Sequence, residues 1–168
     1  LRRRLRDDAD GLQVVEKIEA GLVALDAMVH DFLNFTADRE PHLTAVPLRA
    51  LVTDLLDSLT PQLAAQGVST TVNVAGSLLV SADREALRRA VLNLVLNAVD
   101  AMPDGGAITI TAVQMRDAVE VEIADDGPGL TEEAKRRAFE PFFTTKSNGI
   151  GLGLAIVYRL VESHGGEV

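Results

Sequence analysis

The chain has 168 residues, of which 47% are hydrophobic but only 4% aromatic, so its composition excludes a disordered chain and predicts an aliphatic core. It contains no cysteine, which excludes a disulfide framework and a thiolate nucleophile. The longest apolar run, Leu154 to Tyr158, is too short to span a membrane. The formal net charge of −9 argues against nucleic acid as the main partner, although residues 1–6 (LRRRLR) carry four of the 16 basic groups.

The first part of the chain is predicted to be a helical hairpin. Residues 1–6 have the pattern of a helix end, DDADG at 7–11 supplies turn and capping residues, and an apolar stripe at helical spacing follows. A hairpin this small cannot bury such a stripe, so we expect two copies to form a four-helix arrangement. The alternative is that the stripe packs on the downstream domain of its own chain. The stripe comprises Leu12, Val15, Ile18, Leu22, Leu25, Val29 and Phe32.

The rest of the chain alternates between helical and strand patterns. A linker at 37–46 runs into a short edge strand, Pro47 fits the first turn of a helix that Pro61 kinks or divides, and Gly67 ends that helix. Asp83 is the predicted N-cap of a second long helix. The fold class is therefore α/β, a two-layer sandwich with one mainly antiparallel sheet covered on one face by helices. The predicted elements are helix 47–66, strands 68–75 and 77–82, helix 84–102, strands 107–115 and 119–124, helices 131–138 and 154–164, and a strand starting within 165–168.

Two asparagines interrupt the apolar helix at 84–102. Asn93 and Asn97 are four residues apart and therefore share a face. A buried amide without partners costs about 1–3 kcal/mol, so something must bond to both. A neighbouring strand or a buried water is one explanation. The other is an amide oxygen bound to Mg²⁺, whose remaining ligands are phosphates and water.

The sequence DDGPG at 125–129 directly follows a predicted strand. An Asp-Gly turn by itself indicates only a strand end. Asp125, however, is followed by Gly127 and Gly129, where the backbone can approach a flat ligand closely. An ionised aspartate only accepts hydrogen bonds, and an adenine amino group is a suitable donor.

A glycine-rich segment, GIGLG at 149–153, opens the last predicted helix. Glycines and free N–H groups at a helix N-terminus favour phosphate. The segment is not a Rossmann fingerprint, because Leu154 stands at the third glycine position, and the lack of any Gly-Lys pair excludes a P-loop. The preceding run FEPFFTTK at 139–146 holds three of the five phenylalanines, which predicts a lid with an aromatic anchor. Lys146 either meets a phosphate there or is simply solvated.

Taken in this order, these segments resemble the ATP-binding domain of sensor histidine kinases, within the gyrase, Hsp90, histidine kinase and MutL superfamily. LNLVLNAVDA at 92–101 is similar to the N box of the family and DDGPG to its G1 box. FEPFFTTK is similar to the F box and GIGLGL at 149–154 to the G2 box. The resemblance covers residues 43–168 and implies a Bergerat-type ATP-binding fold that lacks its last strands. Residues 1–37 resemble the C-terminal portion of the dimerisation and histidine-phosphotransfer hairpin.

The resemblance also implies a site for ATP and Mg²⁺. It implies that Asn97 holds the metal, that Asp125 reads adenine, and that Gly127 and Gly129 line the adenine pocket. Asn93 and Lys146 are the candidate catalytic residues and nucleotide contacts. The phosphate-contacting segment that it implies consists of Gly149, Ile150, Gly151, Leu152, Gly153 and Leu154.

Asn93 bears on the type of reaction. ATP-hydrolysing members of the superfamily place a glutamate one helical turn before the metal-binding asparagine, as the base that activates water. Asn93 occupies that position here and cannot take a proton. Phosphoryl transfer to an imidazole needs mainly positioning and charge neutralisation, so Asn93 favours a kinase over an ATP hydrolase.

Two features depart from the family pattern. The phosphoacceptor motif, a histidine followed by an acid and then a proline, is missing, because His30 stands late in the second helix and Pro41 is the first proline after it. We expect the acceptor upstream of Leu1, so that this chain binds ATP but does not phosphorylate itself. Ile150 stands where the family usually has Thr or Ser, which removes a hydroxyl from the lid.

The expected function is that of the catalytic region of a two-component sensor histidine kinase, which transfers the γ-phosphate of ATP to an upstream histidine and then to a response-regulator aspartate. The alternative is a nucleotide-binding regulatory module of the same superfamily without phosphotransfer. The expected partners are a second copy, through the hairpin, and the receiver domain of a response regulator. No contact with nucleic acid or membrane is expected within this chain, which we expect in the cytoplasm as part of a parent that could be membrane-anchored.

Overall fold

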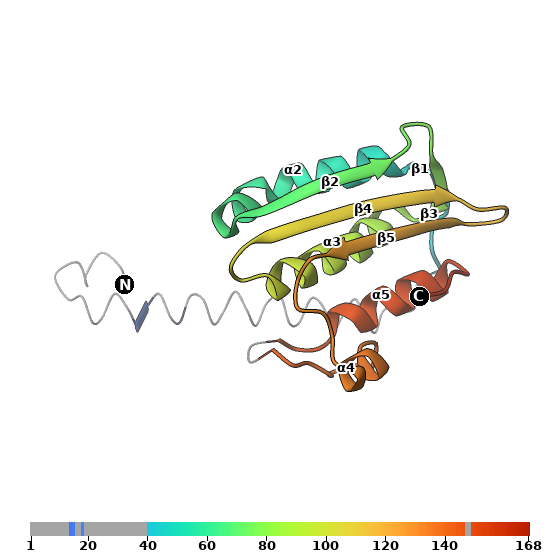
Figure 1. Cartoon of the computed structure of the whole chain (residues 1–168). Coiled ribbons are helices and arrows are strands. Elements are labelled where there is room, and N and C mark those ends of the chain that lie inside the picture. Colours follow the sequence, from blue (N-terminus) through green and yellow to red (C-terminus); the bar gives the residue numbers. More distant parts are fainter. Residues whose placement is uncertain (1–13, 16–17, 19–39, 147–148) are drawn as a thin grey trace. The chain divides into compact units, whose positions relative to one another are not determined.

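A computed structural model of the chain describes residues 14–15, 18, 40–146 and 149–168 (Figure 1). The chain divides into two compact units, Leu1–Ala37 and Asp38–Val168. In the first unit Val14, Val15 and Ile18 are helical. The rest of the predicted hairpin, with His30, lies outside the described residues, so the hairpin and its dimer stay predictions.

The second unit is a mixed α/β structure with helices packed on one face of a sheet, which confirms the predicted fold class. In Figure 1 helices α2 and α3 lie behind the sheet of β2, β4 and β5, and α5 packs against α3. The elements are β1 (Thr44–Pro47), α2 (Leu48–Gln66), β2 (Val68–Val74), β3 (Leu79–Ala82), α3 (Arg84–Ala101), β4 (Gly106–Gln114), β5 (Val119–Asp125), α4 (Glu132–Arg137) and α5 (Gly153–Ser163).

Strand pairing differs from the single sheet that was predicted. β1 and β3 form a separate antiparallel pair, while β2, β4 and β5 form a three-stranded sheet in that order. β2 runs parallel to β4, because β3 and α3 carry the chain back between them, and the short turn after β4 makes β5 antiparallel. Residues 165–168 form no strand, contrary to the prediction. Alternation shows which residues face the core, but a strand also needs a partner, and alternation does not identify it.

The core between the sheet and the helices is aliphatic, as the composition predicts. Ile108 and Ile110 of β4 are fully buried and alternate with the half-buried Thr109 and Thr111, so one face of the strand is turned to the helices. Burying each such side chain stabilises the fold by about 1.5–3 kcal/mol. Helices α2 and α3 contribute Leu48, Leu51, Val52, Leu55, Val95 and Val99, all 1% exposed or less.

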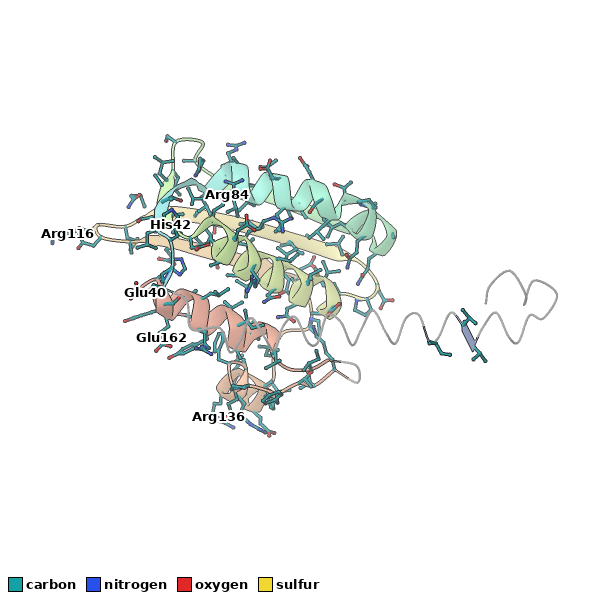
Figure 2. The ribbon with its side chains drawn as sticks, turned by 180° about the vertical axis from the view of Figure 1, so that it is seen from behind. Glu40, His42, Arg84, Arg116, Arg136 and Glu162 are labelled. Atoms are coloured by element: carbon teal, nitrogen blue, oxygen red, sulfur yellow. The ribbon has the colours of Figure 1, made fainter. Side chains whose placement is uncertain are left out.

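Both long helices end much as predicted. Gly67 closes α2 in the left-handed conformation with φ 68°, and the Asp83 carboxylate accepts the N–H groups of Glu85 and Ala86 at the start of α3. Its other oxygen accepts the N–H of His42, which Figure 2 labels beside this helix start. Pro47 is the N-cap of α2 rather than part of its first turn, and Pro61 lies inside α2 without ending it. Within the described residues, no helix has both the length and the apolar composition that a bilayer crossing requires.

Candidate functional site

Helix α3 carries both predicted asparagines on the side that meets the start of α5. The Asn93 Nδ2 donates a hydrogen bond to the Gly153 carbonyl oxygen at 3.3 Å. The Asn97 Nδ2 lies 3.6 Å from the position that a Cβ on Gly153 would take. The partner of Asn93 is thus the first residue of a helix rather than a neighbouring strand, and this bond ties α3 to α5.

The amide oxygen of Asn97 faces a cation. It accepts a hydrogen bond from Lys146 Nζ at 3.0 Å, and the same ammonium group donates to Asp100 Oδ2 at 2.8 Å. Lys146 is therefore not simply solvated. Asp100 was not among the predicted site residues, although it stands three residues after Asn97, a spacing that places both on one helix face and could have identified it.

The two aspartates at the end of β5 have different partners. Asp126 Oδ1 accepts the N–H of Ala107 at 2.9 Å and so extends the pairing with β4. Asp125 is exposed, and its Oδ1 accepts the N–H of Gly127 at 3.0 Å, which orients the carboxylate. Within the described residues the Asp125 Oδ2 has no hydrogen-bond partner, so this oxygen is available to a donor on a ligand.

Gly127 places the turn after Asp125 against the C-terminal end of α3. A Cβ on Gly127 would lie 3.3 Å from Met102 Cγ and 3.4 Å from the Ala101 Cβ. Ala101 follows Asn97 by one helical turn, or about 6 Å along the axis. The loop turn after Asp125 therefore packs on the C-terminal end of α3. Asn97 and its contact with Lys146 lie one helical turn earlier on the same helix.

The phenylalanine-rich run is tied to the glycine-rich segment through the backbone. The Phe142 N–H donates to the Gly151 carbonyl at 2.9 Å, and a Cβ on Gly151 would lie only 2.5 Å from the Phe143 carbonyl oxygen. Gly151 also has φ 72°, so both the space and the conformation require glycine there.

Two aromatic contacts anchor the same run, as predicted. The Phe139 ring lies 6.0 Å from that of Tyr158 on α5, and the Arg137 guanidinium stacks 4.3 Å from the centroid of the Phe143 ring. Phe142 does not take part, since it is 62% exposed.

The start of α5 has no side-chain cap. Its N-cap residue, Leu152, offers no oxygen, so the first N–H groups of the helix are left without a side-chain acceptor and carry partial positive charge. The Leu152 side chain is 2% exposed and those of Ile150 and Leu154 are half-buried, so the backbone of this segment is its main means of contacting a ligand. Gly149 donates its N–H to the Lys146 carbonyl at 3.4 Å.

The donors in this region fit a magnesium ion that is bound mainly by a ligand. Among the described residues, no group of three or more His, Asp or Glu side chains could hold a metal by itself. The Asn97 Oδ1, by contrast, already accepts from an ammonium group and is a hard oxygen ligand. Mg²⁺ keeps several waters and usually takes few protein ligands besides substrate phosphates.

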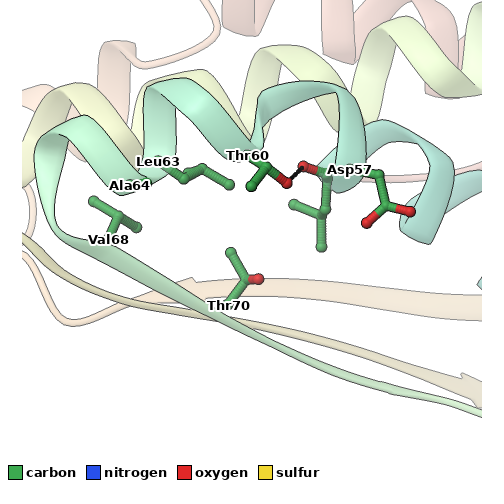
Figure 3. Close-up of a pocket in the computed structure, with 7 residues that line it drawn as sticks. Asp57, Thr60, Leu63, Ala64, Val68 and Thr70 are labelled. Atoms are coloured by element: carbon green, nitrogen blue, oxygen red, sulfur yellow. Dashed lines mark hydrogen bonds between the residues drawn. The ribbon is translucent and has the colours of Figure 1, made fainter.

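A pocket of about 200 Å³ lies elsewhere, between α2 and β2 (Figure 3). It contains a carboxylate and two hydroxyl groups but none of the predicted site residues. We place the functional site along α3 instead, because the oriented carboxylate, the amide oxygen and the uncapped N–H groups are found there. The pocket is lined by Leu56, Asp57, Thr60, Leu63, Ala64, Val68 and Thr70.

Comparison with known proteins gives consistent matches. Residues 82–168 match the family described as "Histidine kinase-, DNA gyrase B-, and HSP90-like ATPase". The sensor histidine kinase ZraS of Klebsiella oxytoca is 35% identical over 146 residues, which cover 86% of this chain and 32% of that protein. Sporulation kinase A of Bacillus subtilis is 38% identical over 92 residues, which cover 55% of this chain and 15% of that protein.

Solved structures agree. Full-length ShkA in complex with AMPPNP has a TM-score of 0.81 and 31% identity, covering 94% of this chain and 35% of that one. The histidine kinase ThkA in complex with the response regulator protein TrrA has a TM-score of 0.78 and 29% identity, covering 95% and 47%. The chain spans only about a third or less of the length of the two curated relatives described. The family match covers more than half of the chain and includes every predicted site residue, so the chain belongs to the histidine kinase-, DNA gyrase B- and HSP90-like ATPase family and is homologous to sensor histidine kinases.

Proposed function

We propose that this chain is the ATP-binding catalytic region of a sensor histidine kinase. It passes the γ-phosphate of ATP to a histidine outside this chain, and from there to an aspartate of a response regulator. The observation that carries the proposal is the arrangement along α3, where the Asn97 amide oxygen and the start of α5 lie one helical turn from the turn after Asp125. The relatives described as sensor histidine kinases, and the neighbour in complex with AMPPNP, support it.

Each residue has a defined role in this proposal. The Asp125 Oδ2 accepts a hydrogen bond from the amino group of adenine, while the Gly127 N–H keeps Oδ1 in place. The uncapped N–H groups of α5 and the backbone of 149–154 contact the phosphates. Asn97 Oδ1 is a ligand of Mg²⁺, which when bound neutralises phosphate charge.

Asn93 supports transfer to a histidine rather than to water. Its amide donates to Gly153 and has no basic nitrogen that could take a proton from water. Its role is to position α5 beside α3. A loss of steady phosphate release on mutating Asn93 would instead support an ATP hydrolase.

The proposal includes two protein partners. We propose that the chain forms a homodimer through the hairpin of the first unit and acts in the cytoplasm. The second partner is the receiver domain of a response regulator, supported by the similar kinase that was solved in complex with such a regulator.

Nucleotide binding tests the site directly. We expect calorimetric titration with AMPPNP and Mg²⁺ to show an affinity about ten- to a hundredfold weaker for Asn97→Ala and for Asp125→Ala, because each change removes a charge-assisted or metal contact. Asp57→Ala is the matched control, since Asp57 lines the unrelated pocket of Figure 3 and its loss is expected to leave the affinity unchanged. Full affinity in both site variants would contradict the assignment.

Phosphotransfer tests the reaction. A protein extended at its N-terminus by its natural upstream sequence is expected to form an acid-labile phosphohistidine when it is given ATP and Mg²⁺. If that extended protein binds ATP but forms no phosphohistidine, the regulatory-module alternative is correct.

A further inference from the structure

Lys146 is hydrogen-bonded to Asn97 Oδ1, the oxygen that is the metal ligand in the proposed function. Its ammonium group donates to Asn97 Oδ1 at 3.0 Å and to Asp100 Oδ2 at 2.8 Å. All three groups lie on or against one face of α3, since Asn97 and Asp100 are three residues apart.

The backbone N–H and carbonyl of Lys146 are both hydrogen-bonded. The Lys146 N–H donates to Thr144 Oγ1 at 3.1 Å, and the Lys146 carbonyl accepts the N–H of Gly149 at 3.4 Å. A Cβ on Gly149 would lie 2.6 Å from Thr144 Oγ1, so the Thr144 side chain would have to turn away to admit one. These hydrogen bonds fix the Lys146 backbone at a place from which its side chain reaches α3.

An ammonium group and Mg²⁺ cannot bind the same amide oxygen together, because two cations so close repel strongly. Any metal that reaches Asn97 therefore has to displace Lys146. The ion pair with Asp100 opposes this displacement, but only weakly, since its side chains are 55% exposed for Asp100 and 39% for Lys146. An exposed ion pair of this kind is weak and opens readily.

We propose that Asp100 is a positioning residue that holds Lys146 on Asn97 when no nucleotide is bound. Asn97, Asp100 and Lys146 then form a latch that the metal–nucleotide complex has to open. The inference rests on the proposed function, because it requires Asn97 to be the metal ligand. Opening the latch also frees the Lys146 ammonium group to contact the phosphates. The same side chain thus binds Asn97 in the nucleotide-free protein and the phosphates in the nucleotide-bound protein.

The latch predicts an effect opposite to that of a ligand residue. Removing a metal or phosphate contact weakens nucleotide binding, whereas removing Asp100 strengthens it, because Lys146 then leaves Asn97 more easily. We expect Asp100→Asn to tighten binding of AMPPNP with Mg²⁺ about two- to fivefold, the range of an exposed ion pair. In the nucleotide-free protein we expect faster amide hydrogen exchange at residues 144–146.

Asp104→Asn is the matched control. It makes the same change of charge just beyond the end of α3, at an exposed side chain with no hydrogen bond or ion pair to the described residues, and we expect neither affinity nor exchange to change. Lys146→Met opens the latch by removing the ammonium group that contacts Asn97 and Asp100. It should raise exchange to the same degree as Asp100→Asn, and the double variant should raise it no further.

The results of these experiments distinguish a failure of the latch from a failure of the proposed function. Weaker or unchanged nucleotide affinity in Asp100→Asn, or unchanged exchange at 144–146, overturns the latch. If Asn97→Ala loses nucleotide binding in the same experiment, the proposed function stands without the latch. If the unaltered chain binds no nucleotide, or Asn97→Ala binds it fully, the proposed function fails and the latch fails with it.

Discussion

Asp83 joins three segments through a single residue. Its carboxylate caps α3 and accepts the N–H of His42, and its own N–H donates to His164 Nε2 at 3.0 Å beyond the end of α5. The hydrogen bonds that the carboxylate accepts lower the pKa of the Asp83 carboxyl below its ordinary value, the bond from the Ala86 N–H most of all, against a smaller effect of burial that raises it. The ionised carboxylate is the form that caps α3 and binds the His42 N–H, whereas the bond to His164 is made by the Asp83 backbone.

Replacing Asp83 tests this junction. We expect Asp83→Ala to lower the free energy of unfolding by about 1–2 kcal/mol near neutral pH, as for other lost N-caps. Because the folded-state pKa lies below the unfolded value of 3.8, the stabilisation is complete above that pH and lost as the pH falls through the folded-state pKa.

Chemical denaturation at several pH values measures the effect. The difference between Asp83→Ala and the unaltered chain should shrink on acidification below about pH 4. Asp83→Asn is the control, since asparagine caps comparably but carries no titrating carboxyl. A difference that is constant with pH would show that the carboxylate charge plays no part.

Ile150 tests the missing hydroxyl of the glycine-rich segment. Its side chain is half-buried, and threonine would keep the branch at Cβ while adding a donor. We expect Ile150→Thr to tighten AMPPNP binding with Mg²⁺ by up to about tenfold, the value of one net hydrogen bond. Ile150→Val is the control for the change in size, and equal affinities of the two variants would exclude a hydroxyl contact.

At the level of elements, the connection before α5 depends on one close backbone approach. Gly151 and the Phe142–Phe143 backbone are too near to admit a Cβ. We expect Gly151→Ala to break the bond from the Phe142 N–H and displace the glycine-rich backbone, which weakens nucleotide binding by at least about tenfold.

Gly165 provides the control for this prediction. It has the same φ of 72°, but nothing lies within 4 Å of its Cβ position, so Gly165→Ala adds backbone strain without a clash. Calorimetric titration should show normal affinity for Gly165→Ala. Equal losses in both variants would mean that φ alone, and not the close approach, matters.

At the level of the whole molecule, the chain divides into two units, and the described core and site residues all belong to the second. We expect residues 38–168 alone to bind AMPPNP with the affinity of the whole chain, because every contact of the proposed site is made within them. Calorimetry of both proteins checks this. A loss of binding in the shorter chain would show that the first unit contributes to the site.

The same pair of proteins tests the dimer. We expect sedimentation equilibrium to find the whole chain dimeric and residues 38–168 monomeric, since the apolar stripe that needs a partner lies in the first unit. A monomeric whole chain would instead favour packing of the stripe on its own second unit.

The helix ends and the aliphatic core could be predicted from local sequence, and so could the candidate site residues other than Asp100. These features depend on near neighbours: the Asp83 cap, Gly67 and the alternation around Ile108 act within a few residues of the chain. Tertiary structure alone decided the parallel pairing of β2 with β4, the separate roles of Asp125 and Asp126, and the contact of Lys146 with Asn97 and Asp100. The strand pairing, the bond from Ala107 to Asp126 and the contacts of Lys146 join segments that local periodicity does not relate. Lys146 follows Asn97 by 49 positions, and only the packing of α5 and its loop against α3 brings that ammonium to the amide oxygen.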